Sequence, residues 1–127
     1  MQYIKQSTKN FDTTCKNLEA SIEKSNFGVL HIHDMKATMA KKDVELGQSC
    51  KVYEICNPHL AKEVLTIDMS ANMLLPCRIS VYTENNETVI GMVNPTELMK
   101  VSTQASVLHE PALLVENKLQ ELINNSL

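Results

Sequence analysis

The chain has 127 residues, of which 43% are hydrophobic and 21% are charged, and its formal net charge is −3. This length and composition are typical of one folded domain and exclude a largely disordered chain. The chain has neither a basic cluster nor a tryptophan, which argues against nucleic acid as a partner.

No apolar run in the sequence is long enough for a signal peptide or a membrane span. We therefore expect a cytoplasmic protein that has no membrane partner. In that compartment the four cysteines are expected to be thiols, metal ligands or core residues rather than a disulfide framework.

The N-terminal part of the chain reads as a short strand followed by an amphipathic helix. Residues 2–6 form the predicted strand, and Asn10 is a suitable N-cap for the helix. Cys15, Leu18 and Ile22 recur at helical spacing, so they are expected on the buried face of the helix.

Two further strands are predicted in the middle of the chain, and each is followed by a helix. Residues 29–33 alternate as a strand does, and Asp34 then caps a short helix. Residues 50–56 form the next strand. Asn57 caps the helix that follows, with Pro58 at its first position.

A β-hairpin is predicted next. A strand that begins at Leu74 or Leu75 shows clean alternation, and residues 88–93 return as its partner. Asn85 and Asn86 tolerate positive φ and predict a tight turn between the two strands.

Two helices are expected after the hairpin. Asn94, with Glu97 at the third helical position, predicts a capping box. Residues 101–110 are expected to form a loop, and Pro111 is expected to start the terminal helix. No repeat or low-complexity linker divides the chain, so residues 1–127 are expected to form a single domain.

Three blocks of the sequence resemble a known family. They are Asp34-Met35-Lys36, the run from Tyr53 through Cys56 to Ala61, and the run from Leu74 to Tyr82. The blocks occur in order within residues 28–95, and they resemble the bacterial and archaeal domain-of-unknown-function family three hundred and two. The resemblance implies a homodimer but no reaction.

The same resemblance implies an α+β fold. A single, mainly antiparallel sheet would be covered by helices in a TATA-binding-protein-like β-α-β-β-β-β-α topology with inserted short helices. The alternation of strands and helices by itself would instead favour a parallel sheet.

The topology decides whether Cys56 and Cys77 can act together. Antiparallel neighbouring strands, which the resemblance implies, would bring the two thiols close, whereas a parallel unit would separate them by about 20 Å. Cys56 also precedes a helix N-terminus, where the helix dipole would stabilise a thiolate. Such a pair could support redox switching, metal ligation or nucleophilic attack, and the alternative for both residues is core packing.

Strand alternation places Glu54 on the same face as Cys56 and opposite Tyr53 and Ile55. If Cys56 points into the core beside Cys77, Glu54 is partly buried and becomes a candidate functional carboxylate. If Tyr53 and Ile55 form the core, Cys56 and Glu54 face outward. The thiol pair is then lost unless a bulge intervenes. The sequence leaves both readings open.

His31 and His33 form an i, i+2 pair on one strand face, a spacing that could supply two metal ligands. No third ligand is identified, and exposed or dimer-interface histidines are the alternative. Leu30 and Ile32 lie on the opposite face of the strand and are expected in the core.

Two functional hypotheses follow, neither with a named cofactor. The first is a non-enzymatic small-ligand-binding or sensing module that acts as a homodimer, with Cys56, Glu54 and Asn57 near the mouth of a pocket between sheet and helices. The second is a thiol-based redox or metal-handling protein that uses Cys56 and Cys77. The sequence carries no phosphate loop, zinc-protease motif or nucleophile elbow, so a non-enzyme is favoured.

Overall fold

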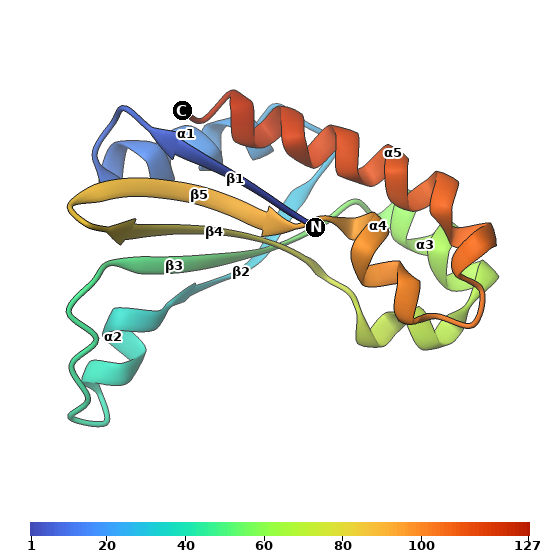
Figure 1. Cartoon of the computed structure of the whole chain (residues 1–127), viewed down its shortest axis with the longest axis horizontal. Helices are drawn as coiled ribbons and strands as arrows, with labels where there is room; N and C mark the ends of the chain where they lie inside the picture. Colours follow the sequence, from blue (N-terminus) through green and yellow to red (C-terminus); the bar gives the residue numbers. More distant parts are fainter.

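The computed structural model describes residues 1–127. It contains five strands, five α-helices and two 3-10 helices (Figure 1). Their order is β1 (Gln2–Ser7), α1 (Phe11–Glu23), β2 (Gly28–Asp34), α2 (Met35–Ala40), β3 (Cys50–Cys56), α3 (Pro58–Ile67), η1 (Met69–Met73), β4 (Cys77–Glu84), β5 (Glu87–Val93), α4 (Pro95–Leu98), η2 (Met99–Val101) and α5 (Ala105–Asn124). No helix is both long and apolar enough to cross a membrane.

The five strands form one sheet in the order β1-β5-β4-β3-β2, and all four neighbouring pairs are antiparallel. This confirms the α+β fold and the β-α-β-β-β-β-α order with short inserted helices. The turn between β4 and β5 has φ values of 53° and 62° at Asn85 and Asn86, as the hairpin prediction requires.

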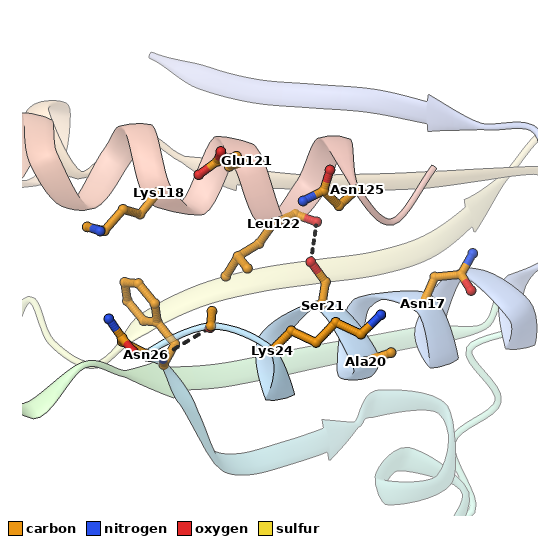
Figure 2. A pocket seen from close by; sticks show the side chains of 11 residues that line it. Asn17, Ala20, Ser21, Lys24, Asn26, Lys118, Glu121, Leu122 and Asn125 are labelled. Atoms are coloured by element: carbon orange, nitrogen blue, oxygen red, sulfur yellow. Dashed lines mark hydrogen bonds between the residues drawn. The ribbon is translucent and has the colours of Figure 1, made fainter.

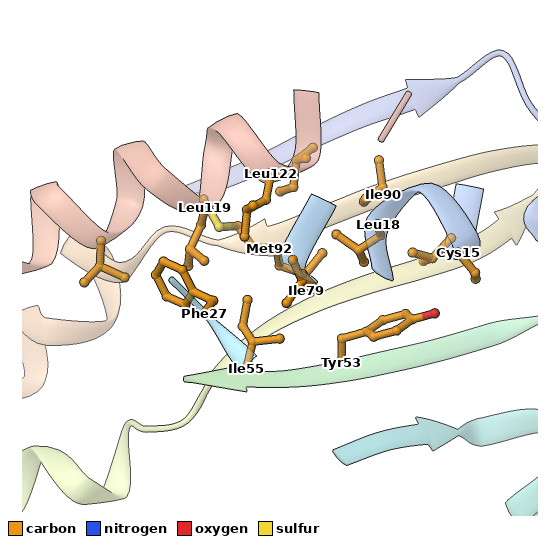
Figure 3. Close-up of a cluster of buried hydrophobic side chains, with 14 residues drawn as sticks. Cys15, Leu18, Phe27, Tyr53, Ile55, Ile79, Ile90, Met92, Leu119 and Leu122 are labelled. Atoms are coloured by element: carbon orange, nitrogen blue, oxygen red, sulfur yellow. The ribbon is translucent and has the colours of Figure 1, made fainter. Parts of the chain in front are cut away.

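The main hydrophobic cluster lies between one face of the sheet and helices α1 and α5 (Figures 1 and 3). Tyr53, Ile55, Ile79 and Leu18 are fully buried in it. On the opposite face of the sheet, by contrast, Ile4 and Val93 remain exposed. We call this second surface the open face.

A second, smaller cluster joins the helices at the other end of the molecule. Its buried members come from α3, η1, η2 and the N-terminal half of α5: Val64, Ala71, Met99, Leu108 and Ala112. The segment 35–49, which contains α2, projects from the ends of β2 and β3 (Figure 1), and no residue of α2 is buried.

Three predicted N-caps are confirmed. Asn10 accepts a hydrogen bond from the Thr13 amide, and Asp34 accepts one from the Ala37 amide. The side chain of Asn57 accepts hydrogen bonds from two amides in the first turn of α3. Each cap satisfies helix N–H groups that have no partner within the helix.

The predicted capping box at Asn94 is wrong. Asn94 makes no side-chain cap, and its Oδ1 is buried without a hydrogen-bond partner. Instead, Oε1 of Glu116 in α5 accepts hydrogen bonds from the amide and the hydroxyl of Thr96, at 3.1 and 2.6 Å. Glu97 binds Lys100 at 3.0 Å rather than reaching back to Asn94. A residue distant in sequence therefore caps α4.

The predicted start of the terminal helix is also wrong. α5 begins at Ala105, so much of the expected loop 101–110 is helical and Pro111 lies inside the helix. Leu108 and Ala112 are buried in the second cluster. Pro111, which lies between them in the sequence, is also buried. Tertiary packing of this helix face offsets the free energy lost because proline cannot donate a hydrogen bond within the helix.

Strand β4 begins at Cys77, later than the predicted start at Leu74 or Leu75. Leu74 is instead the C-cap residue of η1, and Pro76 has no N–H to donate to a neighbouring strand.

Candidate functional site

Cys56 and Cys77 line the same cavity. Cys56 is the last residue of β3, and Cys77, the first residue of β4, lies directly opposite Ile55 in the antiparallel register. The two cysteines, far apart in sequence, are therefore placed at the same end of the sheet. Both cysteines are partly buried, and neither is in a disulfide.

The cavity lies where the two hydrophobic clusters meet. Its volume is about 40 Å³, and 11 of its 14 lining residues are hydrophobic. Phe27 and Ile55 belong to the main cluster (Figure 3), whereas Val64 and Met99 belong to the second. We call this space the junction cavity.

Asn57 lines the junction cavity and is 7% exposed. Its Oδ1 accepts hydrogen bonds from the amides of His59 and Leu60 at 3.1 and 3.2 Å. The sequence candidate Asn57 thus lies beside the thiols, and its carbonyl oxygen holds the start of α3 in place.

Burial, and to a smaller extent the neighbouring Cys56, raise the pKa of Cys77 to about 11. The Cys77 thiol is therefore protonated at neutral pH and is a weak nucleophile. Chemistry at this residue requires a partner that displaces the proton.

Glu54 does not belong to the junction cavity. Tyr53 and Ile55 are fully buried, so strand alternation turns Glu54 to the open face. The expectation that Glu54 and Cys56 share the mouth of a pocket is wrong for this reason. Cys56 still reaches the cavity because it is the final residue of its strand.

Glu54 is instead the centre of a polar cluster on the open face. Its Oε1 lies 2.5 Å from Nε2 of His33, and its Oε2 lies 4.0 Å from an Nη of Arg78. The ring of His31 packs edge-on against that of His33, with centroids 4.4 Å apart. The hydrogen bond with His33 lowers the pKa of Glu54, and the charges of His33, Arg78 and His31 act in the same direction.

A β-bulge places His31 opposite Glu54. The register between β2 and β3 shifts between Val29 and His31, so Leu30 is the extra residue. Leu30 is 62% exposed, and its expected place in the core is wrong. Ile32 does pack against the main cluster, as expected.

The histidine pair lacks the surroundings of a metal centre. No group of three or more His, Cys, Asp or Glu side chains is arranged to hold a metal ion. Nε2 of His33 is already engaged with Glu54.

Sequence reasoning missed two features. Met99, which no local pattern marks, is buried and lines the cavity together with Cys56 and Cys77. A polar groove of about 560 Å³ also runs between α1 and α5 (Figure 2). Lys24 and Lys118 line it, and the Ser21 hydroxyl donates a hydrogen bond to the Leu122 carbonyl at 3.5 Å. Helix pairing creates this groove, so no local motif marks it.

The chain matches a known protein family and solved structures of similar proteins. A family described as domain of unknown function DUF302 matches residues 3–126. The crystal structure of an uncharacterized conserved protein DUF302 from Bacillus stearothermophilus is similar, with a TM-score of 0.93 and 28% sequence identity. That similarity covers 99% of this chain and 98% of that one. No curated protein matches the chain. The resemblance expected from residues 28–95 is confirmed and extends over nearly the whole chain.

Proposed function

The chain belongs to the DUF302 family, and we propose that it is a non-enzymatic binding or sensing module that acts as a homodimer. Its ligand is a small molecule or ion that enters the junction cavity. The observation that carries the proposal is the position of this cavity at the contact between two separate hydrophobic clusters. Ligand sites occur preferentially at interfaces between domains and between packed helices, and this cavity likewise lies between two separately packed parts of the fold.

The lining of the cavity favours binding over catalysis. Its 14 residues include no Asp, Glu, His, Lys or Arg. Proton-transfer catalysis needs a positioned acid or base, and the protonated thiol of Cys77 is a poor one. The lining does match the mainly apolar composition of small-molecule sites.

The size of the cavity limits its occupant. A volume of about 40 Å³ is close to the share of one water in the liquid, about 30 Å³. A larger ligand requires α3, which packs against α5, to move outward. Movement of α3 would carry the binding signal to η1 and the second cluster, since α3 packs against both.

The open face supports self-association. Ile4 and Val93 are 49% and 45% exposed there. Antiparallel sheets do expose one face to water, but that face is then usually polar. A second copy of the chain would bury this apolar surface on both subunits through one twofold contact.

Xenon binding tests whether the junction cavity accepts a ligand. We expect xenon under pressure to shift the methyl NMR signals of Val64 and Val115 in a saturable way, since apolar cavities accept this atom. The Ala61→Val variant adds two methyl groups to the cavity wall and should abolish the shifts. Ala20→Val on the exposed side of α1 carries the same helix penalty and should retain them. Unchanged methyl signals in the original chain would exclude an apolar ligand from this cavity.

A further inference from the structure

Three sulfur-containing residues are among those that line the junction cavity, and they come from three different elements. Cys56 ends β3, Cys77 begins β4, and Met99 begins η2. The two remaining cysteines lie elsewhere: Cys15 is buried in the main cluster, and Cys50 is at the opposite end of β3. Soft donor groups are thus concentrated at one place in the fold.

Without movement of α3, the cavity suits neither a water molecule nor an organic ligand. Apolar residues dominate the lining, and the carbonyl oxygen of Asn57 is already used as a helix cap. A buried water normally needs two to four polar partners, which this lining supplies poorly. A volume of about 40 Å³ also excludes most organic compounds unless α3 moves. A single ion needs no such movement.

The donor set selects the kind of ion. Thiolate and thioether ligands favour Cu(I), whereas carboxylates, carbonyls and water favour Mg²⁺ and Ca²⁺. Structural zinc is held almost always by four ligands from Cys, His, Asp or Glu. Only Cys56 and Cys77 of these types line the cavity, so zinc would lack two ligands.

From this arrangement we propose that Cys56, Cys77 and Met99 bind one soft monovalent cation, Cu(I) or its redox-inactive analogue Ag(I). The inference rests on the proposed function, because it names the occupant of the same cavity. The two thiols supply the strong ligands, and the Met99 thioether supplies a weaker third.

Binding conserves charge through the release of protons. Two neutral thiols lose two protons, and two metal–sulfur bonds form with one monovalent ion. The bound site therefore carries one net negative charge. No other titratable residue lines the cavity, so the released protons come from Cys56 and Cys77.

The ion would also tie the two clusters together. Cys56 and Cys77 are attached to the sheet, whereas Met99 belongs to the second cluster. Occupancy would fix the helical end of the molecule against the sheet, and loss of the ion would release it. This coupling gives the sensing role of the proposed function a physical basis.

Competition against a chromophoric Cu(I) chelator under anaerobic conditions tests the proposal. We expect one Cu(I) per chain, with sulfur as the only ligand element in the X-ray absorption spectrum, and weaker retention of Zn(II). Loss of a second-shell partner typically lowers metal affinity 10–100-fold, so loss of a direct ligand in Cys56→Ser or Cys77→Ser should cost at least about 100-fold. Met99→Leu should cost roughly 10-fold.

The matched control is Cys50→Ser, which removes a partly exposed thiol outside the cavity. It should bind Cu(I) as the original chain does, and circular dichroism should show that all variants are folded. The cation site is overturned if the chain binds Zn(II) as tightly as Cu(I). It is also overturned if Cys50→Ser loses as much Cu(I) affinity as Cys56→Ser or Cys77→Ser. Xenon binding without Cu(I) binding overturns only this inference, whereas the absence of both overturns the proposed function as well.

Discussion

Nε2 of His33 lies 2.5 Å from Oε1 of Glu54 on the open face of the sheet. His31 and Arg78 flank this pair, so three basic side chains surround one carboxylate. Strand register creates the arrangement, because His31, Glu54 and Arg78 occupy directly opposed positions on β2, β3 and β4.

The Glu54 cluster predicts an acid-dependent loss of stability. The pKa of Glu54 is lowered from its ordinary value of 4.5, chiefly by its hydrogen bond with His33. A lowered pKa in the folded state adds stability above the unfolded value, and that stability disappears as pH falls through the folded value. We therefore expect the original chain to be more stable than Glu54→Gln near neutral pH, and we expect this difference in stability to shrink as the pH falls.

Thermal unfolding between about pH 6 and pH 2 would measure this difference, since carboxylates titrate in that range. Glu84→Gln, an exposed carboxylate beside the hairpin turn, is the control and should leave the pH profile unchanged. A constant difference between the original chain and Glu54→Gln at every pH would contradict the account.

The two Asn-Pro helix starts should respond differently to mutation. Asn57→Ala removes a cap that accepts two amide hydrogen bonds and should cost about 1 kcal/mol of unfolding free energy. Asn94→Ala removes a side chain that makes no cap, so its effect should be smaller. Urea denaturation would compare them, and a larger loss for Asn94→Ala would show that the assigned caps are wrong.

Replacement of Gly91 by a larger residue should destabilise the fold. A Cβ at this position would lie 3.0 Å from the carbonyl oxygen of Tyr3 and 3.1 Å from the side chain of Ile4 in β1. Since the carbonyl belongs to the strand backbone, Gly91→Ala should displace β1 and cost about 1–3 kcal/mol.

Gly28→Ala is the matched control for Gly91→Ala, because a Cβ there meets no atom within 4 Å. It should leave the free energy of unfolding nearly unchanged. Equal destabilisation by the two substitutions in urea would exclude a steric cause.

If the homodimer forms through the open face, substitutions on that face should halve the mass of the particle in solution. Ile4→Glu or Val93→Glu would place an unpaired charge in the interface and should convert dimer to monomer in sedimentation velocity experiments. Val107→Glu on α5, which is 55% exposed outside the sheet, should remain dimeric. A dimer that persists in both open-face variants would place the contact elsewhere.

Much of the local structure could be predicted from the sequence. The caps at Asn10, Asp34 and Asn57 depend on residues within the next turn, and the hairpin depends on the φ preference of Asn85 and Asn86. These preferences act over a few residues, so they can be read without knowledge of the fold. The terminal helix shows the limit, because distant packing allowed it to continue through Pro111.

The candidate site depended on information that local patterns do not contain. Alternation along β3 separates Tyr53 from Glu54, but it does not state which side faces α1 and α5. The tertiary structure decided this when it buried Tyr53, and it also brought Met99 to Cys56 and Cys77. The sequence by itself determined the elements, because their signals are short-range. Only the packing of distant elements decided the site, because a cavity exists only where separate surfaces meet.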